Sequence, residues 1–431
     1  MTVATVVDEV TQDSKLIGYL IQSGSKVSQI DSKSLKRALS NNSMLLTKYK
    51  LTSDNRLIRS ESDCTYWLMN KDKKVAEFNL ENDEFIGVGK LPYNFQNIRN
   101  WLNRRMAYTC VDDADAFYKG IGIKSVDKLV EQCYCISLRD SFWVKHQNCQ
   151  LTWEQVSPFR NHYSNGVSTY SMSRQSTSNI DDLYSPDLST PGSFPHTWKM
   201  EDGTVTFLKA GSKYTLGGIN SGMEPYSEYY ASKVCDYLKF NHVNYELSHY
   251  KRNDASMDLI TTCKCFTSEQ YGSVSAYDLG LKTYENVIEY CKKLSKHAYE
   301  SILDMLFLDC LLVNTDRHMG NIEFIMNNDT LEVVDIAPIF DNNYSLLPRF
   351  LEPYDVFSLK DYKARDDRTF DDLYRLILKH KSFEPYLQKL VGFKLVENTT
   401  YRMRAGRIIV LNYLIETQTK YWLDFEKNNK Q

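Results

Sequence analysis

The polar segment NTDRHMGN, residues 314–321, follows directly on the apolar run LDMLFLDCLLV. Within it, Asp316 lies five positions before Asn321. In phosphoryl transfer, a carboxylate can accept the proton of an attacking hydroxyl group while a neutral amide oxygen holds Mg²⁺ beside the phosphates. The same residue types also bind free backbone groups where a helix ends. The segment therefore has two interpretations, a phosphoryl-transfer loop or a helix cap made by Thr315, Asp316 and Asn321.

A second candidate carboxylate lies in the sequence LEVVDIAPIFDNNYSLL, residues 331–347. The alternation in residues 331–337 predicts a strand, and Asp341 follows it after a proline and an aromatic residue. A phosphoryl-transfer site needs a carboxylate on a separate element to hold Mg²⁺ against the phosphates. Asp335 is the alternative, but its place inside an alternating strand predicts a side chain that points to solvent. We therefore favour Asp341.

A basic residue and a carboxylate that could bind phosphates occur earlier in the chain. Lys209 lies in the predicted strand TVTFLKAG, where a charge in an apolar run is costly unless it has a partner. Glu228, at the start of the predicted helix EPYSEYYASKVCDYL, could be that partner. The alternative is a surface lysine whose aliphatic stem lies along the protein. The order Lys209, Glu228, Asp316, Asn321, Asp341 is that of kinase folds, which favours the functional interpretation.

Composition limits the class of protein. The chain has 431 residues, of which 42% are hydrophobic, 25% charged and 13% aromatic, as expected of a globular protein with room for a two-lobed enzyme and an added module. Its formal net charge of −3 gives no basic field for a nucleic-acid backbone. Nucleic acid is therefore disfavoured as a direct partner.

The sequence predicts neither export nor insertion into a membrane. The N-terminus MTVATVVDEVTQDSK carries acidic residues where a signal peptide has basic ones, and apolar runs such as IIVLNYLI are too short to span a bilayer. We expect a cytoplasmic protein without a membrane partner. Its ten cysteines, including the pairs Cys133/Cys135 and Cys263/Cys265, are then expected to be reduced structural thiols.

Periodicity predicts an α+β fold with two lobes, and the kinase-like order of the candidate residues makes it a bilobal protein-kinase-like fold with an additional N-terminal α+β module. The module, residues 1–160, contains a predicted hairpin at 65–85, short helices at 97–105 and 125–135, and a strand within 135–147. A Ser/Thr/Asn-rich linker follows at 161–193. Residues 194–282 form a β-rich lobe with one helix, and 283–431 a helical lobe that starts with one long helix or two shorter ones.

Two of these motifs resemble the hallmarks of the HipA family of bacterial kinases. The family's N-x-D-R-H-x-x-N catalytic loop is present as NTDRHMGN, and its A-P-I-F-D-N metal loop as APIFDNN. The segment STPGSFPHTW, residues 189–198, also resembles the family's phosphate loop. The resemblance runs from about residue 185 to the C-terminus. The earlier part is similar to the N-terminal part of longer family members.

The resemblance implies ATP and Mg²⁺ as cofactors and a role for each candidate residue. It implies that Asp316 accepts or orients the hydroxyl proton, that His318 braces the loop, and that Asn321 and Asp341 hold Mg²⁺. It further implies that Lys209 binds the α- and β-phosphates and that Glu228 orients Lys209. The other implied positions are the phosphate loop, with Ser189, Thr190, Gly192 and Ser193, and an adenine-binding hinge from Lys264 to Phe266. Ser189 matches the serine that such kinases autophosphorylate.

The sequence as a whole predicts a HipA-like serine/threonine protein kinase. The family implies a toxin-like regulator of growth that phosphorylates a protein substrate such as a translation component, with an antitoxin as a further partner. Two alternatives stay open: a kinase-fold enzyme acting on a small molecule or lipid, and a non-catalytic nucleotide-binding regulator. Pro191 and His196 support the regulator, because the family often has a lysine where His196 stands and Pro191 removes a backbone donor.

Overall fold

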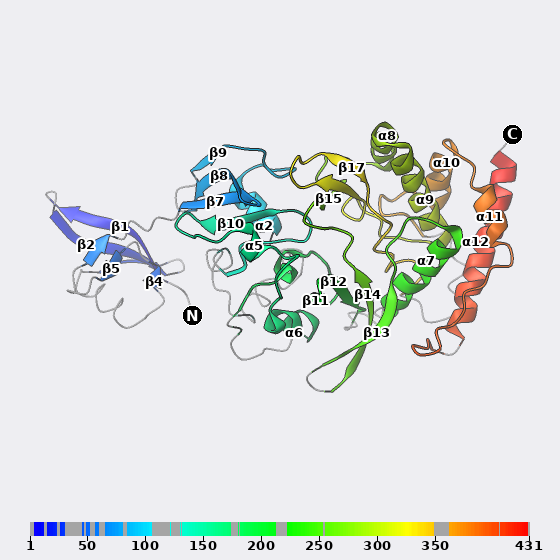
Figure 1. Cartoon of the computed structure of the whole chain (residues 1–431), viewed down its shortest axis with the longest axis horizontal. Coiled ribbons are helices and arrows are strands. Elements are labelled where there is room, and N and C mark those ends of the chain that lie inside the picture. The colour runs from blue at the N-terminus through cyan, green and yellow to red at the C-terminus, as the bar shows by residue number, and fades with distance from the viewer. Residues whose placement is uncertain are drawn as a thin grey trace. The chain divides into compact units, whose positions relative to one another are not determined.

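Figure 1 shows the computed structural model of the chain, which describes part of its residues. The described residues are 4–12, 15–23, 26–30, 45–46, 49–51, 57–59, 65–80, 84–105, 121, 130, 132–173, 180, 182–212, 222–252, 255–348, 362–404 and 406–429. The chain divides into two compact units, Met1–Thr65 and Tyr66–Gln431. Each unit is described by itself.

The described residues of the first unit form strands. A four-stranded sheet has the order β3-β2-β1-β4, in which β1 pairs antiparallel with β2 and parallel with β4. The segment of β1, ATVVDEVTQ, is rich in Val and Thr, the β-branched residues that favour strands. The bounds are β1 Ala4–Gln12, β2 Lys15–Ser23, β3 Lys26–Ile30 and β4 Leu45–Leu46, with a separate hairpin of β5 Tyr49–Leu51 and β6 Leu57–Arg59.

The second unit begins with a sheet of order β10-β7-β8-β9. Its strands are β7 Thr65–Asn70, β8 Lys73–Asn79, β9 Phe85–Gly87 and β10 Phe142–His146. The predicted hairpin is confirmed, with Lys71 in the left-handed region at φ 49° in the connecting turn. The helix predicted at 97–105 is confirmed as α2, Ile98–Arg105. Most of the helix predicted at 125–135 lies outside the described residues.

The Ser-rich segment 161–193 contains two helices that the sequence analysis did not predict. Residues Asn165–Ser173 form α6, and Pro186–Ser189 form a short 3₁₀ helix, η2. The interpretation of this whole stretch as a linker was therefore wrong for α6, which packs Met172 against Leu208 and Ile260 of the following lobe. Small polar residues surround these few apolar anchors, so the sequence shows no helical period. A short helix, α5 Trp153–Val156, precedes the segment.

The β-rich lobe has the predicted strands and helix. An antiparallel sheet of order β11-β12-β14-β13 is formed by β11 His196–Glu201, β12 Thr204–Ala210, β14 Met257–Lys264 and β13 Glu246–Lys251. Helix α7, Glu224–Leu238, packs against β12, β13 and β14 (Figure 1). A three-stranded sheet then joins β15 Tyr271–Ser275 to β16 Glu323–Asn327 and β17 Val333–Ile336.

The helical lobe begins with two helices rather than one. Helix α8, Tyr284–Leu294, ends at Ser295, whose hydroxyl accepts the backbone N–H of Ala298 and so caps the start of α9, Lys296–Leu312. The remaining helices are α10 Phe370–Leu378, α11 Glu384–Leu390 and α12 Arg407–Asn429. Phe307 of α9 lies in an aromatic cluster with Tyr374, Phe383 and Tyr386. The predicted α+β class, with a β-rich lobe followed by a helical one, is confirmed.

Three further expectations concern boundaries, thiols and membranes. Residues 66–160 belong to the same compact unit as the two lobes, so the module boundary at 160 stays a prediction. The cysteines of the described part, which include both CxC pairs, are free thiols. No helix in the described part is both long enough and apolar enough to cross a membrane.

We expect Phe307→Ala to lower the free energy of unfolding by about 3–5 kcal/mol, because it leaves a cavity beside Phe383. The matched control is Ile409→Ala on α12, whose side chain is 69% exposed, with an expected change within about 0.5 kcal/mol. Denaturant unfolding followed by circular dichroism measures both. Equal effects of the two substitutions would contradict this assignment of the core.

Candidate active site

Lys209 and Glu228 are joined in the β-rich lobe. Lys209 lies on β12 and Glu228 on α7, and the lysine Nζ is 3.0 Å from Glu228 Oε1. The side chains are 15% and 1% exposed, so the pair is screened from water. Burial lowers the pKa of Lys209, but the carboxylates of Asp341 and Glu228 outweigh burial and raise it above its ordinary value. The ammonium is therefore held charged.

The same pair also binds the loop that carries Asp341. Lys209 Nζ donates to Asp341 Oδ1, and the backbone N–H of Asn342 donates to Glu228 Oε2 at 2.7 Å. Asp341 has a φ of 54°, a left-handed conformation that reverses the chain just after Phe340. Burial raises the pKa of Asp341, yet the charge of Lys209 outweighs burial and lowers it. The Asp341 carboxylate is therefore ionised and faces a cation.

The catalytic-loop candidate begins where α9 ends. Val313 takes a left-handed φ of 54°, and its N–H donates to the carbonyl of Asp309. The side chain of Asn314 then donates to Asp309 at 2.8 Å and accepts the N–H of Asp316 at 3.1 Å. Asn314 thus supplies the side-chain contacts at this helix end. In the described part of the chain, the Asp316 carboxylate has Arg365 as an ion-pair partner, at 3.6 Å.

Arg317 is the residue that the sequence analysis missed. Its guanidinium is 1% exposed and forms an ion pair with Asp309, with Nε to Oδ2 at 3.0 Å. The same group donates to the carbonyls of Asn321 and Phe340 at 3.2 and 2.5 Å, and to Asn342 Oδ1 at 2.8 Å. Arg317 therefore holds the catalytic-loop and metal-loop candidates together. The signal available in the sequence was an Asp inside the apolar run before it, which needs a buried partner.

His318 has the contacts of a bracing residue. Its Nδ1 accepts the backbone N–H of Gly320 at 3.0 Å, so that nitrogen carries no proton in this arrangement. Burial lowers the pKa of His318, against the opposing charge of Asp316. Burial also raises the pKa of Asp316, chiefly against the charge of His318. Burial therefore makes the Asp316 carboxylate a better proton acceptor than an exposed Asp, and the His318 ring a weaker one than an exposed His.

Oxygen donors suited to Mg²⁺ are present on the two loops. Asn321 Nδ2 donates to the carbonyl of Asp316 at 3.1 Å, which leaves its amide oxygen as the available acceptor. The described residues contain no cluster of three His, Cys, Asp or Glu side chains able to hold a metal. Mg²⁺ is nevertheless commonly bound by one or two protein oxygens together with water and substrate phosphates. Asn321 and Asp341 fit that donor set, whereas Asp335 pairs with His297 at 2.9 Å.

Two of the phosphate-loop candidates bind within their own segment. The hydroxyls of Ser189 and Thr190 both donate to the carbonyl of Pro186, at 3.1 and 2.8 Å. Ser193 is exposed, and a Cβ on Gly192 would lie 3.0 Å from the ring of His196.

The far end of this loop does reach the lysine. The Phe194 ring lies 6.0 Å from Lys209 Nζ, and the buried His196 ring faces the carbonyls of Phe194 and Thr190. The hinge candidates lie at the end of β14, where Lys264 pairs with Thr206 and the Phe266 ring packs 5.6 Å from that of Phe340.

Several solved structures are similar to this chain, among them the following two, whereas no family model and no curated protein matches. The Helicobacter pylori proinflammatory kinase CtkA is 19% identical, over 53% of this chain and 88% of that chain, with a TM-score of 0.40. HipA of Shewanella oneidensis MR-1, solved in complex with HipB and operator DNA, is 12% identical, over 84% of this chain and 98% of that chain, with a TM-score of 0.45. Similarity to HipA is what the sequence motifs predict. Likenesses at this level carry no argument about activity, so function has to be argued from the site.

We expect Arg317→Met to lower the free energy of unfolding by about 3–5 kcal/mol, because the buried Asp309 carboxylate loses its cationic partner. Adding Asp309→Leu should recover part of that loss, since the unpaired charge is then removed. A double-mutant cycle in denaturant measures the coupling. Strictly additive effects would contradict the role assigned to the pair.

The stability of the fold should depend on pH through Asp187, a buried residue that joins η2 to β11. It accepts the hydroxyl of Thr197 at 2.6 Å and the N–H of Trp198 at 2.8 Å, while burial raises its pKa to about 7. An unfolded Asp titrates near ~3.9. The folded state therefore binds the Asp187 proton more tightly than the unfolded state. Protonated Asp187 adds to the free energy of unfolding at low pH, and this addition is lost as pH rises toward about 7.

Asp187→Asn should remove that contribution, so the difference in unfolding free energy between wild type and variant should change by roughly 2–4 kcal/mol across this window. The control is Asp424→Asn, an exposed residue on α12. A difference that stays constant with pH would show that Asp187 keeps an ordinary pKa.

Proposed function

We propose that this chain is an ATP- and Mg²⁺-dependent serine/threonine protein kinase. The observation that carries the proposal is the convergence on Lys209, which contacts both Glu228 of α7 and Asp341 of the metal-loop candidate. A lysine placed between these two carboxylates can bind phosphates while the metal-binding Asp stays beside it. Arg317 holds the catalytic-loop candidate, which carries Asp316 and Asn321, next to the metal-loop candidate.

Each residue has a defined task in this mechanism. The Lys209 ammonium, whose pKa is raised, binds the α- and β-phosphates, and Glu228 fixes its position. Mg²⁺, held by Asn321 and Asp341, would supply charge neutralisation at the transferred phosphoryl group. Asp316 orients the substrate hydroxyl and takes its proton, a task that suits a carboxylate whose pKa is raised by burial.

The acceptor and the biological role are proposed from the sequence motifs. By resemblance to HipA proteins, the substrate is a protein such as a translation component, the setting is cytoplasmic, and the activity restrains growth under the control of an antitoxin. Autophosphorylation at Ser189 belongs to the same proposal. The solved HipA complex contains an antitoxin-system partner, HipB, and DNA, which motivates a search for a partner of this chain.

The test is phosphoryl transfer from γ-labelled ATP with Mg²⁺, read by intact mass and phosphosite mapping. We expect Lys209→Met and Asp316→Asn to lower the rate by at least about 100-fold, as expected for loss of phosphate positioning or of the general base. Asp335→Asn is the matched control, because Asp335 is a nearby carboxylate paired with His297 on the surface. Equal rates for Asp316→Asn and Asp335→Asn would contradict the proposal. ATP binding without any transfer would favour the non-catalytic regulator.

A further inference from the structure

A segment of the helical lobe without helix or strand, residues 391–402, follows α11 and forms a strap. Its backbone is fixed to α12, where the Asn412 side chain accepts the N–H of Leu395 at 2.7 Å and donates to the Leu395 carbonyl at 3.1 Å. Further along, the side chain of Asn398 turns the strap by accepting the N–H of Tyr401 at 2.9 Å. The strap therefore has an ordered backbone that is anchored in the helical lobe.

Two buried tyrosines of α7 bind the strap through their hydroxyl groups. The hydroxyl of Tyr226 donates to the carbonyl of Arg402 at 2.8 Å, and the hydroxyl of Tyr230 accepts the N–H of Asn398 at 3.1 Å. Tyr226 is 9% exposed and Tyr230 0%. Figure 1 shows α7 in green beside the orange and red elements α11 and α12. A helix of the β-rich lobe is thus bound directly to the end of the chain.

Further aromatic contacts extend this attachment at both ends of the strap. The hydroxyl of Tyr237, in the last turn of α7, donates to the carbonyl of Lys389 at 3.0 Å, and the Tyr237 ring lies 4.5 Å from that of Phe393. At the other end, the Tyr401 ring meets that of His249 on β13 edge to face at 4.8 Å. The strap therefore contacts both α7 and the sheet of the β-rich lobe.

The strap and the candidate active site lie on opposite faces of α7. At 3.6 residues per turn, the three tyrosines lie within about 40° of one another around the helix, whereas Glu228 lies roughly 180° away from them. On that second face, Glu228 accepts the Lys209 ammonium at 3.0 Å and the backbone N–H of Asn342 at 2.7 Å. Helix α7 is therefore held from both sides, by the strap and by the active-site residues.

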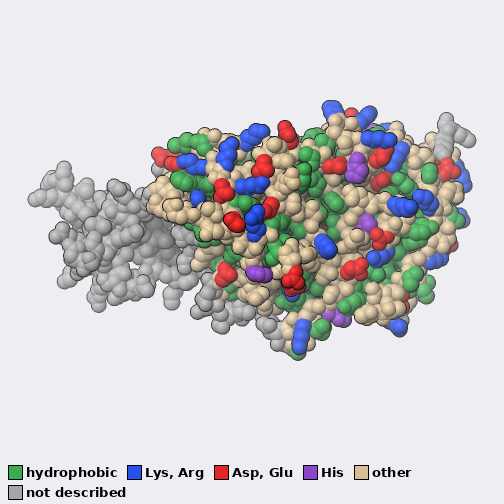
Figure 2. All heavy atoms as spheres, viewed as in Figure 1, with side chains coloured by type: hydrophobic (Ala, Val, Ile, Leu, Met, Phe, Trp, Pro, Cys, Tyr) green, Lys and Arg blue, Asp and Glu red, His purple; other side chains and the backbone are tan. Residues whose placement is uncertain are grey.

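The strap has the features of a segment that can detach without opening the core. Among residues 391–400 Leu395 is buried, whereas Val391 and Val396 are 62% and 82% exposed. Segments with few buried apolar contacts open at a lower free energy than the core does. The surface around α7 and α12 mixes hydrophobic and charged side chains (Figure 2). The outer side of the strap is thus open to solvent while its inner side holds α7.

We infer that the strap positions α7 and thereby keeps Glu228 against Lys209. Tyr226 and Tyr230 are the positioning residues, because their hydroxyls are the buried links between α7 and the strap. Loss of these links lets α7 shift, so that Lys209 keeps its contact with Asp341 but loses Glu228. The consequence for nucleotide binding rests on the proposed function, whereas the control of the position of α7 does not.

The first arm measures amide hydrogen exchange in the full chain without nucleotide, at single-residue resolution. The N–H of Asn342 is the reporter, since it is protected by Glu228 and lies on the far side of α7 from the strap. In the variant with both Tyr226→Phe and Tyr230→Phe, we expect Asn342 to exchange at least about threefold faster, the factor that one lost hydrogen bond supplies. The amides of α9 should exchange as in the wild type. Tyr226→Phe alone serves if the double variant does not fold.

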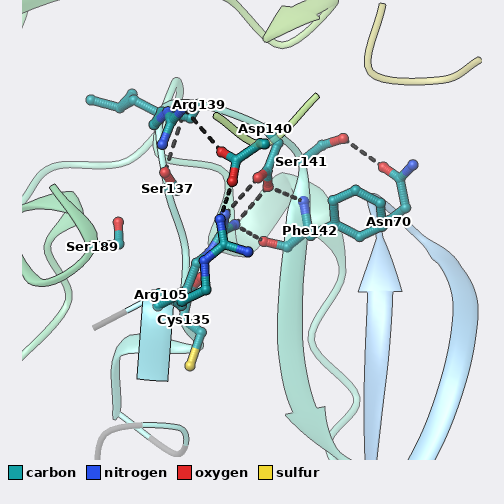
Figure 3. A network of polar contacts seen from close by, with 12 residues as sticks. Asn70, Arg105, Cys135, Ser137, Arg139, Asp140, Ser141, Phe142 and Ser189 are labelled. Atoms are coloured by element: carbon teal, nitrogen blue, oxygen red, sulfur yellow. Dashed lines mark hydrogen bonds and ion pairs between the residues drawn. The ribbon is translucent and has the colours of Figure 1, made fainter. Parts of the chain in front are cut away.

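Two control variants lose a comparable hydrogen bond elsewhere. Tyr93→Phe removes a hydroxyl that donates to the carbonyl of Leu331 at 2.7 Å, and Ser141→Ala removes one that donates to Asn70 at 2.5 Å (Figure 3). Both should leave the exchange of Asn342 unchanged. Unchanged exchange of Asn342 in the tyrosine variants would overturn the inference. So would an equal acceleration in α9, because that result marks a general loss of stability.

The second arm measures the Kd of a non-hydrolysable ATP analogue with Mg²⁺. We expect the double tyrosine variant to weaken binding at least about threefold, and the same substitutions to change it less than about twofold when Glu228→Gln is also present, because the strap acts through Glu228. Equal effects in both backgrounds would overturn this route. If Lys209→Met leaves binding unchanged or the wild type does not bind, the proposed function fails, and the exchange of Asn342 alone decides the role of the strap.

Discussion

The buried ion pair between Arg317 and Asp309 is the constraint on which the candidate site depends. Both side chains are 1% exposed, and an uncompensated charge at that depth would be strongly unfavourable. The pair is tolerated because further donors of Arg317 bind the carbonyls of Asn321 and Phe340. Two loops that are distant in sequence are thereby fixed to the end of α9. Specific positioning, rather than net stability, is what such a pair contributes.

The second link runs between the lobes. Lys209 and Glu228 belong to the β-rich lobe, and they contact Asp341 and the backbone of Asn342 in the helical half. A shift of α7 would therefore move Glu228 away from Lys209 and from the metal-loop candidate at once. Phe194 packs beside the same lysine.

The sequence was most informative where chemistry depends on order along the chain. Lys209, Glu228 and Asp341 could be selected as candidates because a charge in an apolar strand and a carboxylate after a strand are unusual placements, and Lys209 contacts both carboxylates. Arg317 was given no role because spacing does not reveal that a charged side chain is buried. Helix α6 was not predicted, because its Ser and Thr residues leave no helical period of apolar residues in the sequence. Packing of Met172 against the β-rich lobe holds this helix in place. The pocket lined by Arg104, Arg105 and Arg139 could not be predicted, because its residues are brought together only by the tertiary fold.

The most direct measurement is a crystal structure of the full chain with Mg²⁺ and a non-hydrolysable ATP analogue. The account predicts a metal ion bound by the Asn321 amide oxygen and the Asp341 carboxylate, with the Lys209 ammonium on the α- and β-phosphates and its contact to Glu228 retained. A nucleotide bound elsewhere, or one whose phosphates avoid Lys209 and Asp341, would contradict the central claim that these residues form a phosphoryl-transfer site.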